Sequence, residues 1–512
     1  MTEDVATVAN VADLVCRAAA AAPGKAALLY REQQLSWGDL DAAVDRAAGG
    51  LRRLGLDRGD RVALVTGNIP EFVVAYFGAL RAGLVAVPVN PASTRDELRH
   101  VIGESGAVAA VCGRGPADGV LAVVPETGLE HVIVADVAVP PEGARAFDDV
   151  LAAGSGPAES VGGGPDLAVL LYTSGTSGQP RGVMLTHRAL LANLEQCARI
   201  EPPIASADDV VLLVLPLFHV YGLAAGLGVV ARFGATAVLV ERFDPVDSLQ
   251  TLRRCHVTNV VGAPPMYLAW AMPSMLRQLA EAFDSVRLAV SGSAPLPPEV
   301  FGRVLEATGR PVFEGYGLTE AAPVCATTLM SPVPKPGSIG RPIPGVELRL
   351  LGEDGEPAVD GDPGEIVIRG PNLFSGYWPD RAGGPGPDGW FATRDVAYAD
   401  ADGDLFLIDR RDDLILVSGF NVYPREVEAA LTAHPDIAEA AVLPIPHPYT
   451  GQSVRALVVL AEGARLTAED VIDHAATRLA GFKCPTVVEF VAALPHSTAG
   501  KIAKGRLRGE PT

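Results

Sequence analysis

The first half of the chain alternates between segments of helical period and short apolar segments. An amphipathic helix is predicted over 36–54, where Ser36 is suited to cap its N-terminus. Short apolar segments at 60–65 and 85–90 have the character of buried strands, and a second helix is predicted over 70–83 between them. This strand–helix alternation favours mainly parallel sheets flanked by helices. The apolar face of the first helix consists of Leu40, Val44, Ala47, Leu51 and Leu54.

The pattern changes beyond about Pro342. Apolar and polar residues then alternate between Gly and Asp turns, which predicts antiparallel strands and hairpins, one of them over 398–410. A short α+β module follows the charged segment 410–413, and within it Thr467 and Asp470 have capping-box spacing. We therefore predict a domain boundary within 410–413.

Composition and charge limit the classes of protein to which the chain can belong. Its 512 residues exceed what one hydrophobic core organises, so two or more domains are expected. The net charge of −20 argues against nucleic acid or an anionic membrane surface as the main partner. Six scattered cysteines fit reduced thiols, and no uncharged apolar segment reaches the ~20 residues that a transmembrane helix needs. These features predict a cytoplasmic protein.

The segment "YTSGTSGQPRG", residues 172–182, has the composition of a phosphate-binding loop. Its glycines allow backbone amides to approach phosphate closely, and its hydroxyls add donors. It is not a Walker loop, because only two residues separate Gly175 from Gly178 and Gly182 follows Arg181. On its own, such a segment is more often a mobile surface loop.

Three further segments carry residues suited to nucleotide chemistry. Thr319 and Glu320 in "EGYGLTEAAP" are suited to a phosphate oxygen and Mg²⁺, and Asp395 to ribose hydroxyls. Arg410 lies at the predicted boundary, and Lys501 follows a glycine in a polar loop. Taken singly, Thr319 and Glu320 are better explained as an ordinary helix start and Lys501 as a solvated lysine, and a hairpin with turn aspartates is the alternative for Asp395. Their order along the chain is what favours a shared site.

Together these segments resemble the core motifs of the adenylate-forming enzymes, which include acyl- and aryl-CoA synthetases, peptide-synthetase adenylation domains and beetle luciferases. The resemblance covers essentially the whole chain. The segment "LVSGFNVYP" is especially similar to bacterial long-chain fatty acyl-CoA ligases, whereas "FHVYGL" and "GYGLTEAAPV" also resemble plant coumarate-CoA ligases. The matching motifs are "YTSGTSGQPRGVMLTHRAL", "LPLFHVYGL", "SGSAPLP", "GYGLTE", "DRRDDLILVSGFNVYPREVE" and "PHSTAGKIAK".

The resemblance implies an α/β fold in two domains. The large N-terminal domain, 1–409, would hold stacked, mainly parallel sheets with flanking helices and a small barrel-like β part, and would bind ATP and the acyl group. Residues 410–412 would form a hinge centred on Asp412. A small mobile α+β domain, 413–512, would follow.

The resemblance also implies a role for each matching residue. The phosphates of ATP would be held by Thr173, Ser174, Gly175, Thr176, Ser177, Gly178 and Arg181. The adenine would be bordered by Ser293, Ala294, Glu314, Gly315 and Tyr316. The ribose would be held by Asp395 and Arg410, and the coenzyme A tunnel lined by Ser418 and Gly419. The acyl pocket would consist of His219, Tyr221, Gly315, Pro323 and Val324. Catalysis would rest on Thr319, on Glu320 as the Mg²⁺ ligand, and on Lys501.

Two positions depart from the family pattern. Arg181 stands where the family usually has Lys, and it keeps the charge but not the shape. Arg394 stands where a Gly usually precedes the ribose-binding Asp395, so a left-handed backbone there would be strained.

The implied activity is ATP-dependent activation of a carboxylic acid to acyl-AMP and pyrophosphate, followed by transfer to CoA. A medium- or long-chain fatty acid is the first expectation. An aromatic acid, or loading of an acyl carrier protein in place of CoA, are the alternatives. From a different class, a nucleotide-binding protein without catalysis is favoured by Arg394 and opposed by Glu320 and Lys501. The expected partners are ATP, CoA and the acid, while peripheral membrane contact and a homodimer stay open.

Overall fold

The computed structural model describes residues 9–154, 159–173, 180–352, 354–359, 361–410, 414–417, 420–448, 450–496 and 502–507. The chain divides into two compact units. The first comprises Met1–Thr173, Pro180–Glu347 and Arg369–Gly389, and the second comprises Ser174–Gln179, Leu348–Ile368 and Trp390–Thr512. The predicted hinge at 410–412 falls within the second unit, and as a domain boundary it stays a prediction.

A seven-stranded sheet organises the N-terminal part of the first unit. All neighbouring strands are parallel except the last pair, which forms an antiparallel hairpin. The order is β7 (Arg145–Ala146), β6 (His131–Val134), β5 (Ala107–Cys112), β3 (Arg61–Val65), β4 (Val85–Pro88), β8 (Leu167–Thr173) and β9 (Arg181–Thr186).

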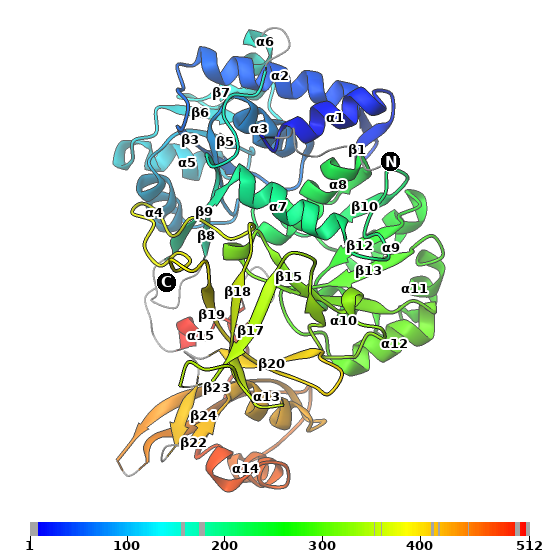
Figure 1. Cartoon of the computed structure of the whole chain (residues 1–512), viewed down its shortest axis with the longest axis vertical. Coiled ribbons are helices and arrows are strands. Elements are labelled where there is room, and N and C mark those ends of the chain that lie inside the picture. Colours follow the sequence, from blue (N-terminus) through cyan, green and yellow to red (C-terminus); the bar gives the residue numbers. More distant parts are fainter. Residues whose placement is uncertain are drawn as a thin grey trace. The chain divides into compact units, whose positions relative to one another are not determined.

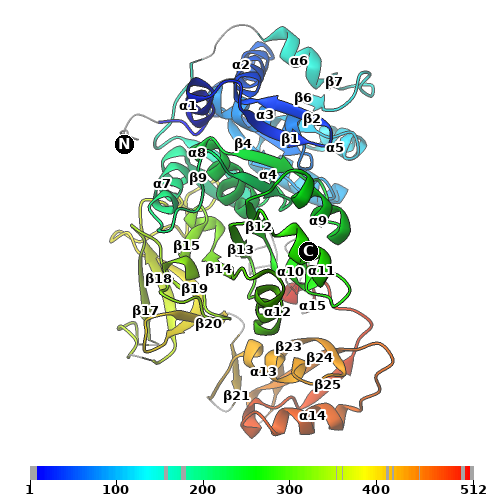
Figure 2. The ribbon, with the colours of Figure 1, turned by 90° about the vertical axis from the view of Figure 1, so that its right-hand side faces the viewer.

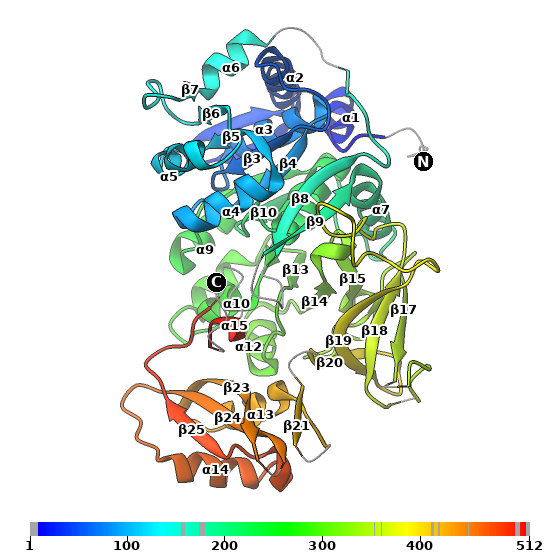
Figure 3. The same ribbon diagram turned by 90° about the vertical axis from the view of Figure 1, so that its left-hand side faces the viewer.

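Helices cover both faces of this sheet (Figures 1 and 3). The chain moves from β3 to β4 in one direction and from β4 to β5 in the other, so right-handed crossovers place α3 and α4 on opposite faces. A capping box between Ser36 and Asp39 begins α2, as the sequence predicts for Ser36. The helices of this region are α1 (Asp13–Ala21), α2 (Trp37–Arg53), α3 (Pro70–Arg81), α4 (Arg95–Ser105), α5 (Ala117–Val123), α6 (Phe147–Ala153) and α7 (His187–Ala198).

A nine-stranded sheet forms the rest of the first unit, with five parallel pairs at its centre. Its order is β16 (Arg341–Pro342), β15 (Val324–Thr327), β14 (Val312–Gly317), β13 (Leu288–Ser291), β12 (Asn259–Gly262), β10 (Val210–Leu213), β11 (Thr236–Leu239), β1 (Ala26–Tyr30) and β2 (Gln33–Ser36). One hydrophobic core joins its central strands to the helices that follow them. Figure 2 shows these helices beside the strands. The helices are α8 (Val229–Phe233), α9 (Pro245–Arg254), α10 (Pro264–Trp270), α11 (Leu276–Ala282) and α12 (Pro298–Thr308).

The second unit contains two smaller sheets. The first is the antiparallel part that the sequence predicts beyond Pro342, with the order β17 (Glu347–Leu351), β18 (Gly364–Arg369), β19 (Phe391–Ala399) and β20 (Leu405–Arg410). The second has the order β22 (Phe420–Val422), β21 (Ile415–Val417), β24 (Gly451–Leu460) and β23 (Ile437–His447), and β25 (Val487–Phe490) pairs with β24. The helices are α13 (Pro424–Thr432), α14 (Ala468–Ala476) and α15 (Lys504–Leu507).

The architecture confirms the expected α/β class, with large parallel sheets in the N-terminal part and a small α+β module at the C-terminal end. The predicted capping box of Thr467 and Asp470 begins α14. Within the described ranges, no helix is both long and apolar enough to cross a membrane.

Candidate active site

The predicted phosphate loop connects β8 to β9. Thr173 and Arg181 end these strands as directly opposed antiparallel partners, so the base of the loop is set by the hairpin register. The predictions on Ser174, Gly175, Thr176, Ser177 and Gly178 lie outside the described residues.

Thr319 and Glu320 lie in a 3₁₀ turn (η4, Thr319–Ala321) directly after β14. Oε1 of Glu320 accepts a hydrogen bond from the hydroxyl of Tyr377 at 2.7 Å. Among the described residues, no hydrogen bond is made to the second carboxylate oxygen, Oε2. Because Mg²⁺ in nucleotide enzymes is usually held by one or two carboxylates together with substrate phosphates, a single carboxylate of this kind fits Mg²⁺.

Buried side-chain amides hold the segment that follows Glu320. Asn193 of α7 donates from Nδ2 to the carbonyl of Val324 at 2.8 Å and accepts from its N–H at 3.1 Å. One turn further, Gln196 donates to Asn372 Oδ1 at 3.1 Å, and Asn372 donates to the carbonyl of Ala321 at 2.8 Å. The backbone next to the Thr-Glu pair is therefore fixed from outside the pocket.

Glu314 is a buried anchor on the predicted adenine side. Its carboxylate accepts hydrogen bonds from the backbone N–H groups of Leu296 at 2.9 Å and Gly337 at 3.0 Å. Burial raises the pKa of the Glu314 carboxyl to about 6, and the two backbone donors oppose that shift. The anchored loop begins with Ser293, at a φ of 73°, and Ala294. Glu314 thus shapes the loop whose residues are predicted to meet the adenine.

Two other predicted adenine residues, Gly315 and Tyr316, continue β14 and pair with Thr327 and Ala326 of β15. A Cβ on Gly315 would come no closer to another residue than 3.9 Å, to the carbonyl oxygen of Ala326. Position 315 therefore has room for a side chain.

The predicted acyl pocket contains a buried phenol. Tyr221 begins a π-helical segment (η3, Tyr221–Gly228), and its ring carbons lie 2.9 Å from where a Cβ on Gly292 would be. Position 292 is therefore limited to glycine. The hydroxyls of Tyr221 and Ser291 are buried without a hydrogen-bond partner among the described residues. His219 accepts the N–H of Tyr221 through Nδ1 at 3.2 Å.

Asn68 fixes the backbone that leads into this pocket segment. Its Nδ2 donates to the carbonyls of Leu213 at 3.2 Å, Leu215 at 2.9 Å and Val240 at 3.2 Å. Its Oδ1 accepts the N–H of Leu217 at 2.9 Å. One side chain therefore joins the end of β3 to the loop after β10.

In the second unit, the predicted ribose residues Asp395 and Arg410 are directly opposed across β19 and β20. Arg394 has a φ of 64°, so the left-handed backbone that the sequence comparison implied is present. Its N–H donates to Glu365 Oε1 at 3.1 Å, and the N–H of Asp395 donates to Thr393 Oγ1 at 3.1 Å. These N–H groups lie within β19, opposite the register shift between Glu365 and Val367 of β18.

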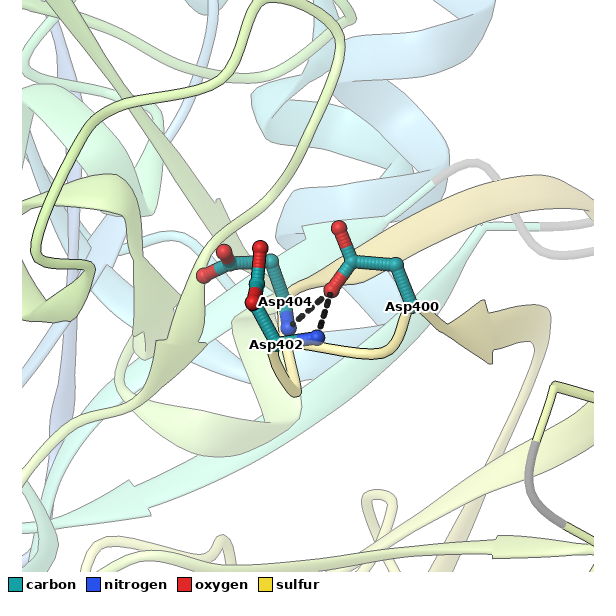
Figure 4. Close-up of side chains that lie close together, drawn as sticks. All are labelled: Asp400, Asp402 and Asp404. Carbon is teal, nitrogen blue, oxygen red and sulfur yellow. Dashed lines mark hydrogen bonds between the residues drawn. The ribbon is translucent and has the colours of Figure 1, made fainter.

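Three aspartates gather in the turn between β19 and β20, with carboxylate oxygens within 4.8 Å of one another (Figure 4). Oδ1 of Asp400 accepts the backbone N–H groups of Asp402 and Asp404, both at 3.0 Å. The cluster is therefore explained by the hairpin, as the sequence suggested for turn aspartates.

The remaining predicted residues, Asp412, Ser418, Gly419 and Lys501, lie outside the described residues. The neighbours of Lys501 are described. His496 and Ile502 form an antiparallel bridge, and Lys504 Nζ pairs with Glu428 at 2.8 Å. The bridge joins the two flanks of the Lys501 segment to each other, His496 Nε2 lies 3.3 Å from Glu439 Oε1 of β23, and Lys504 attaches the second flank to α13.

Sequence comparisons place this geometry in a known family. The pattern of the AMP-binding enzymes matches residues 15–378, and that of their C-terminal domain matches residues 426–501. The chain belongs to the family of AMP-binding enzymes.

Its relatives extend over nearly the whole chain. A long-chain-fatty-acid–CoA ligase of Bacillus subtilis is 34% identical, with 96% of this chain and 93% of the relative covered. A feruloyl-CoA synthase of an Amycolatopsis species is 37% identical, with 96% and 97% covered. The crystal structure of ATP-bound MatB from Rhodopseudomonas palustris superposes with a TM-score of 0.88 at 33% identity, covering 98% of each chain. In activity class, the protein is an AMP-forming acid–thiol ligase.

Proposed function

We propose that the chain joins a medium- or long-chain fatty acid to CoA through an acyl-AMP intermediate. In the first step, a carboxylate oxygen forms a bond to the α-phosphorus of ATP and the bond to pyrophosphate breaks. In the second, the thiol of CoA forms the thioester, AMP leaves, and the thiol proton is released. The observation that carries the choice of acid is the 34–36% identity to several long-chain-fatty-acid–CoA ligases over 89–96% of the chain.

The charges of the two reactants in the first step explain why cationic and hydrogen-bond-donating residues are proposed for it. Two anions must meet, so the step depends on preorganised cationic and donor groups. Thr319 would donate to a phosphate oxygen, and Arg181 and Lys501 would supply positive charge. When bound at Glu320, Mg²⁺ would neutralise phosphate charge. Glu320 would hold it, and the Tyr377 hydroxyl would orient Glu320.

Two half-reactions at one site require two arrangements of the C-terminal module. Lys501 is assigned to adenylation, whereas Ser418 and Gly419 are assigned to the CoA tunnel, and all three belong to that module. We propose that the module from residue 413 onward turns about Asp412 between the steps.

A hydroxylated aromatic acid is the second candidate, and one observation favours it. Buried hydroxyls normally have a partner, yet those of Tyr221 and Ser291 have none among the described residues. Burial also raises the pKa of the Tyr221 hydroxyl well above its usual value, so it would act as a neutral donor. A polar substituent on the acid would satisfy such a donor.

The test is to incubate the protein with ATP, Mg²⁺, CoA and equal amounts of fatty and hydroxylated aromatic acids, and to identify thioesters by mass. The proposal expects fatty acyl-CoA as the main product. Preference for the aromatic acid, with a loss of at least tenfold in Tyr221→Phe, would establish the second candidate. Lys501→Ala separates catalysis from binding, because ATP should still bind while acid-dependent pyrophosphate release is lost.

A further inference from the structure

Tyr377 belongs to a segment that pairs with β9, the strand that follows the phosphate loop. The N–H of Ser375 donates to Met184, that of Met184 to Gly376, and that of Trp378 to Gly182, at 2.8–3.2 Å. Gly376 has a φ of 103°, and a Cβ there would lie 2.1 Å from the carbonyl oxygen of Arg381. Position 376 therefore requires glycine. The close approach of Gly376 to the backbone of Arg381 fixes the position of the Tyr377 backbone.

The side chain of Tyr377 contacts two residues of the proposed adenylation machinery. Its hydroxyl donates to Glu320 Oε1 at 2.7 Å. The guanidinium carbon of Arg181 lies 3.8 Å from the centre of its ring. The neighbouring Phe374 also donates its N–H to the carbonyl of Glu320 at 2.8 Å. One short segment therefore bonds both the side chain and the backbone of Glu320 and also stacks on Arg181.

We propose that Tyr377 is a positioning residue, whose hydroxyl orients the Glu320 carboxylate toward the metal–phosphate group while its ring holds Arg181 at the base of the phosphate loop. The hydroxyl occupies Oε1 and leaves Oε2 to face the ligand. Because a guanidinium is planar, it stacks on an aromatic face better than an ammonium does. The departure from Lys at position 181 therefore has a use in this chain. The inference rests on the proposed role of Glu320 as the metal ligand.

The simpler alternative is that Tyr377 only packs against its neighbours. Tyr377→Phe separates the two, because it keeps the ring, the stacking on Arg181 and the edge contact with Phe374 at 5.1 Å between ring centres, and removes only the hydroxyl. Tyr30→Phe is a matched control, since the Tyr30 hydroxyl also donates to a carboxylate, that of Glu241, at 2.5 Å. Tyr377→Leu removes the ring as well.

The experiment measures ATP binding by calorimetry on the full chain, with and without Mg²⁺, together with the melting temperature. We expect the affinity of Tyr377→Phe for ATP without Mg²⁺ to lie within twofold of that of the unchanged protein. The factor by which Mg²⁺ strengthens ATP binding should fall about tenfold, which is the effect of one charge-assisted hydrogen bond. Tyr377→Leu should in addition bind ATP without Mg²⁺ several-fold more weakly, because Arg181 is released. Tyr30→Phe should match the unchanged protein in every measurement.

An undiminished gain from Mg²⁺ in Tyr377→Phe overturns the positioning role. So does equal weakening with and without Mg²⁺, or a melting temperature lowered by several degrees, because both would show a purely structural role. Glu320→Gln tests the underlying assignment separately. If that variant keeps the full gain from Mg²⁺, the role of Glu320 fails, whatever Tyr377→Phe shows.

Discussion

The backbone N–H of Arg394 donates to the carboxylate of Glu365 at 3.1 Å, and it does so from a left-handed conformation with a φ of 64°. A side chain in this region costs about 1–2 kcal/mol, whereas glycine adopts it freely. The stabilisation expected from relieving this strain is partly offset, because glycine has greater conformational freedom in the unfolded chain. We expect Arg394→Gly to raise the free energy of unfolding by about 1 kcal/mol, measured by urea denaturation.

Arg394→Ala is the control, because it removes the same side chain and keeps the strain. If glycine and alanine change stability equally, the left-handed backbone is not the cause. A fall of more than about 1 kcal/mol in the glycine variant would show that contacts of the arginine side chain outweigh the strain.

Glu314→Gln should destabilise the fold by about 1–3 kcal/mol near pH 5. Both carboxylate oxygens accept backbone N–H groups, and the amide of Gln would place a donor against one of them. Glu299→Gln, on an exposed face of α12, is the control.

The difference in the free energy of unfolding between the unchanged protein and Glu314→Gln should depend on pH in a defined direction. The pKa of Glu314 is raised from 4.5 to about 6 in the fold, so the fold favours its protonated form. The contribution of Glu314 to the free energy of unfolding is fully present below about pH 4.5 and is lost as pH rises through about 6. The advantage of the unchanged protein over Glu314→Gln should fall by about 2 kcal/mol between pH 4.5 and 7. An advantage that grows over this interval would contradict the burial of the charge.

Gly315→Val should shift chain-length preference toward shorter acids while leaving the fold intact. The nearest atom to a new Cβ is the carbonyl oxygen of Ala326 at 3.9 Å, so the Cβ itself meets no clash. Acyl-CoA products from a series of acids provide the measurement. An unchanged profile would place the pocket elsewhere.

Gly317→Ala, two residues along the same strand, is the contrasting case. A Cβ there would lie 2.1 Å from the carbonyl oxygen of Pro323. We expect a loss of about 3 kcal/mol in the free energy of unfolding, without a defined shift in substrate preference.

Lys504→Met should slow adenylation about tenfold with little effect on thioester formation from supplied acyl-AMP. The 2.8 Å pair of Lys504 with Glu428 attaches the segment after Lys501 to α13, and loss of position at a reacting group is costly. Lys483→Met breaks the comparable pair with Glu426, at 2.6 Å in the same module, and serves as control. Equal effects of both variants on both steps would indicate general destabilisation of the module.

Asp412→Pro tests the proposed hinge. Proline fixes φ near −65° and removes one backbone donor, so rotation should be hindered while the adenylation groups stay unchanged. Acid-dependent pyrophosphate exchange should persist while transfer to CoA slows. Normal rates in both half-reactions would remove the hinge from position 412.

The elements that the sequence predicted best are those encoded over short distances. The capping residue Ser36 bonds a residue three positions away, as does Thr467, so their signals are local. The left-handed backbone at Arg394, within β19, was also predictable, because the family pattern has glycine there. No local pattern indicates the hydrogen bond between Tyr377 and Glu320, because these residues are 57 positions apart.

The buried amides Asn193, Gln196 and Asn372 were missed for a related reason. Asn193 and Gln196 lie on α7 and Asn372 lies in a turn, and a polar side chain does not reveal its partner when that partner is on a distant segment. The π-helical segment at Tyr221 was likewise unpredicted, because this period is rare and three of its eight residues are glycines, which are poor helix formers.

Asn193 forms two hydrogen bonds with the backbone of Val324. The residue that holds the fold at this point is therefore a different one from the residue proposed to determine substrate specificity. An amide on α7 holds the backbone of Val324, a proposed pocket residue, so we expect the side chain at 324 to be exchangeable without loss of the fold. A chain built in this way can acquire a new acid preference through single substitutions at 324 that leave it folded. Substitution of Asn193, by contrast, would leave the carbonyl and the N–H of Val324 without these partners and should destabilise the fold.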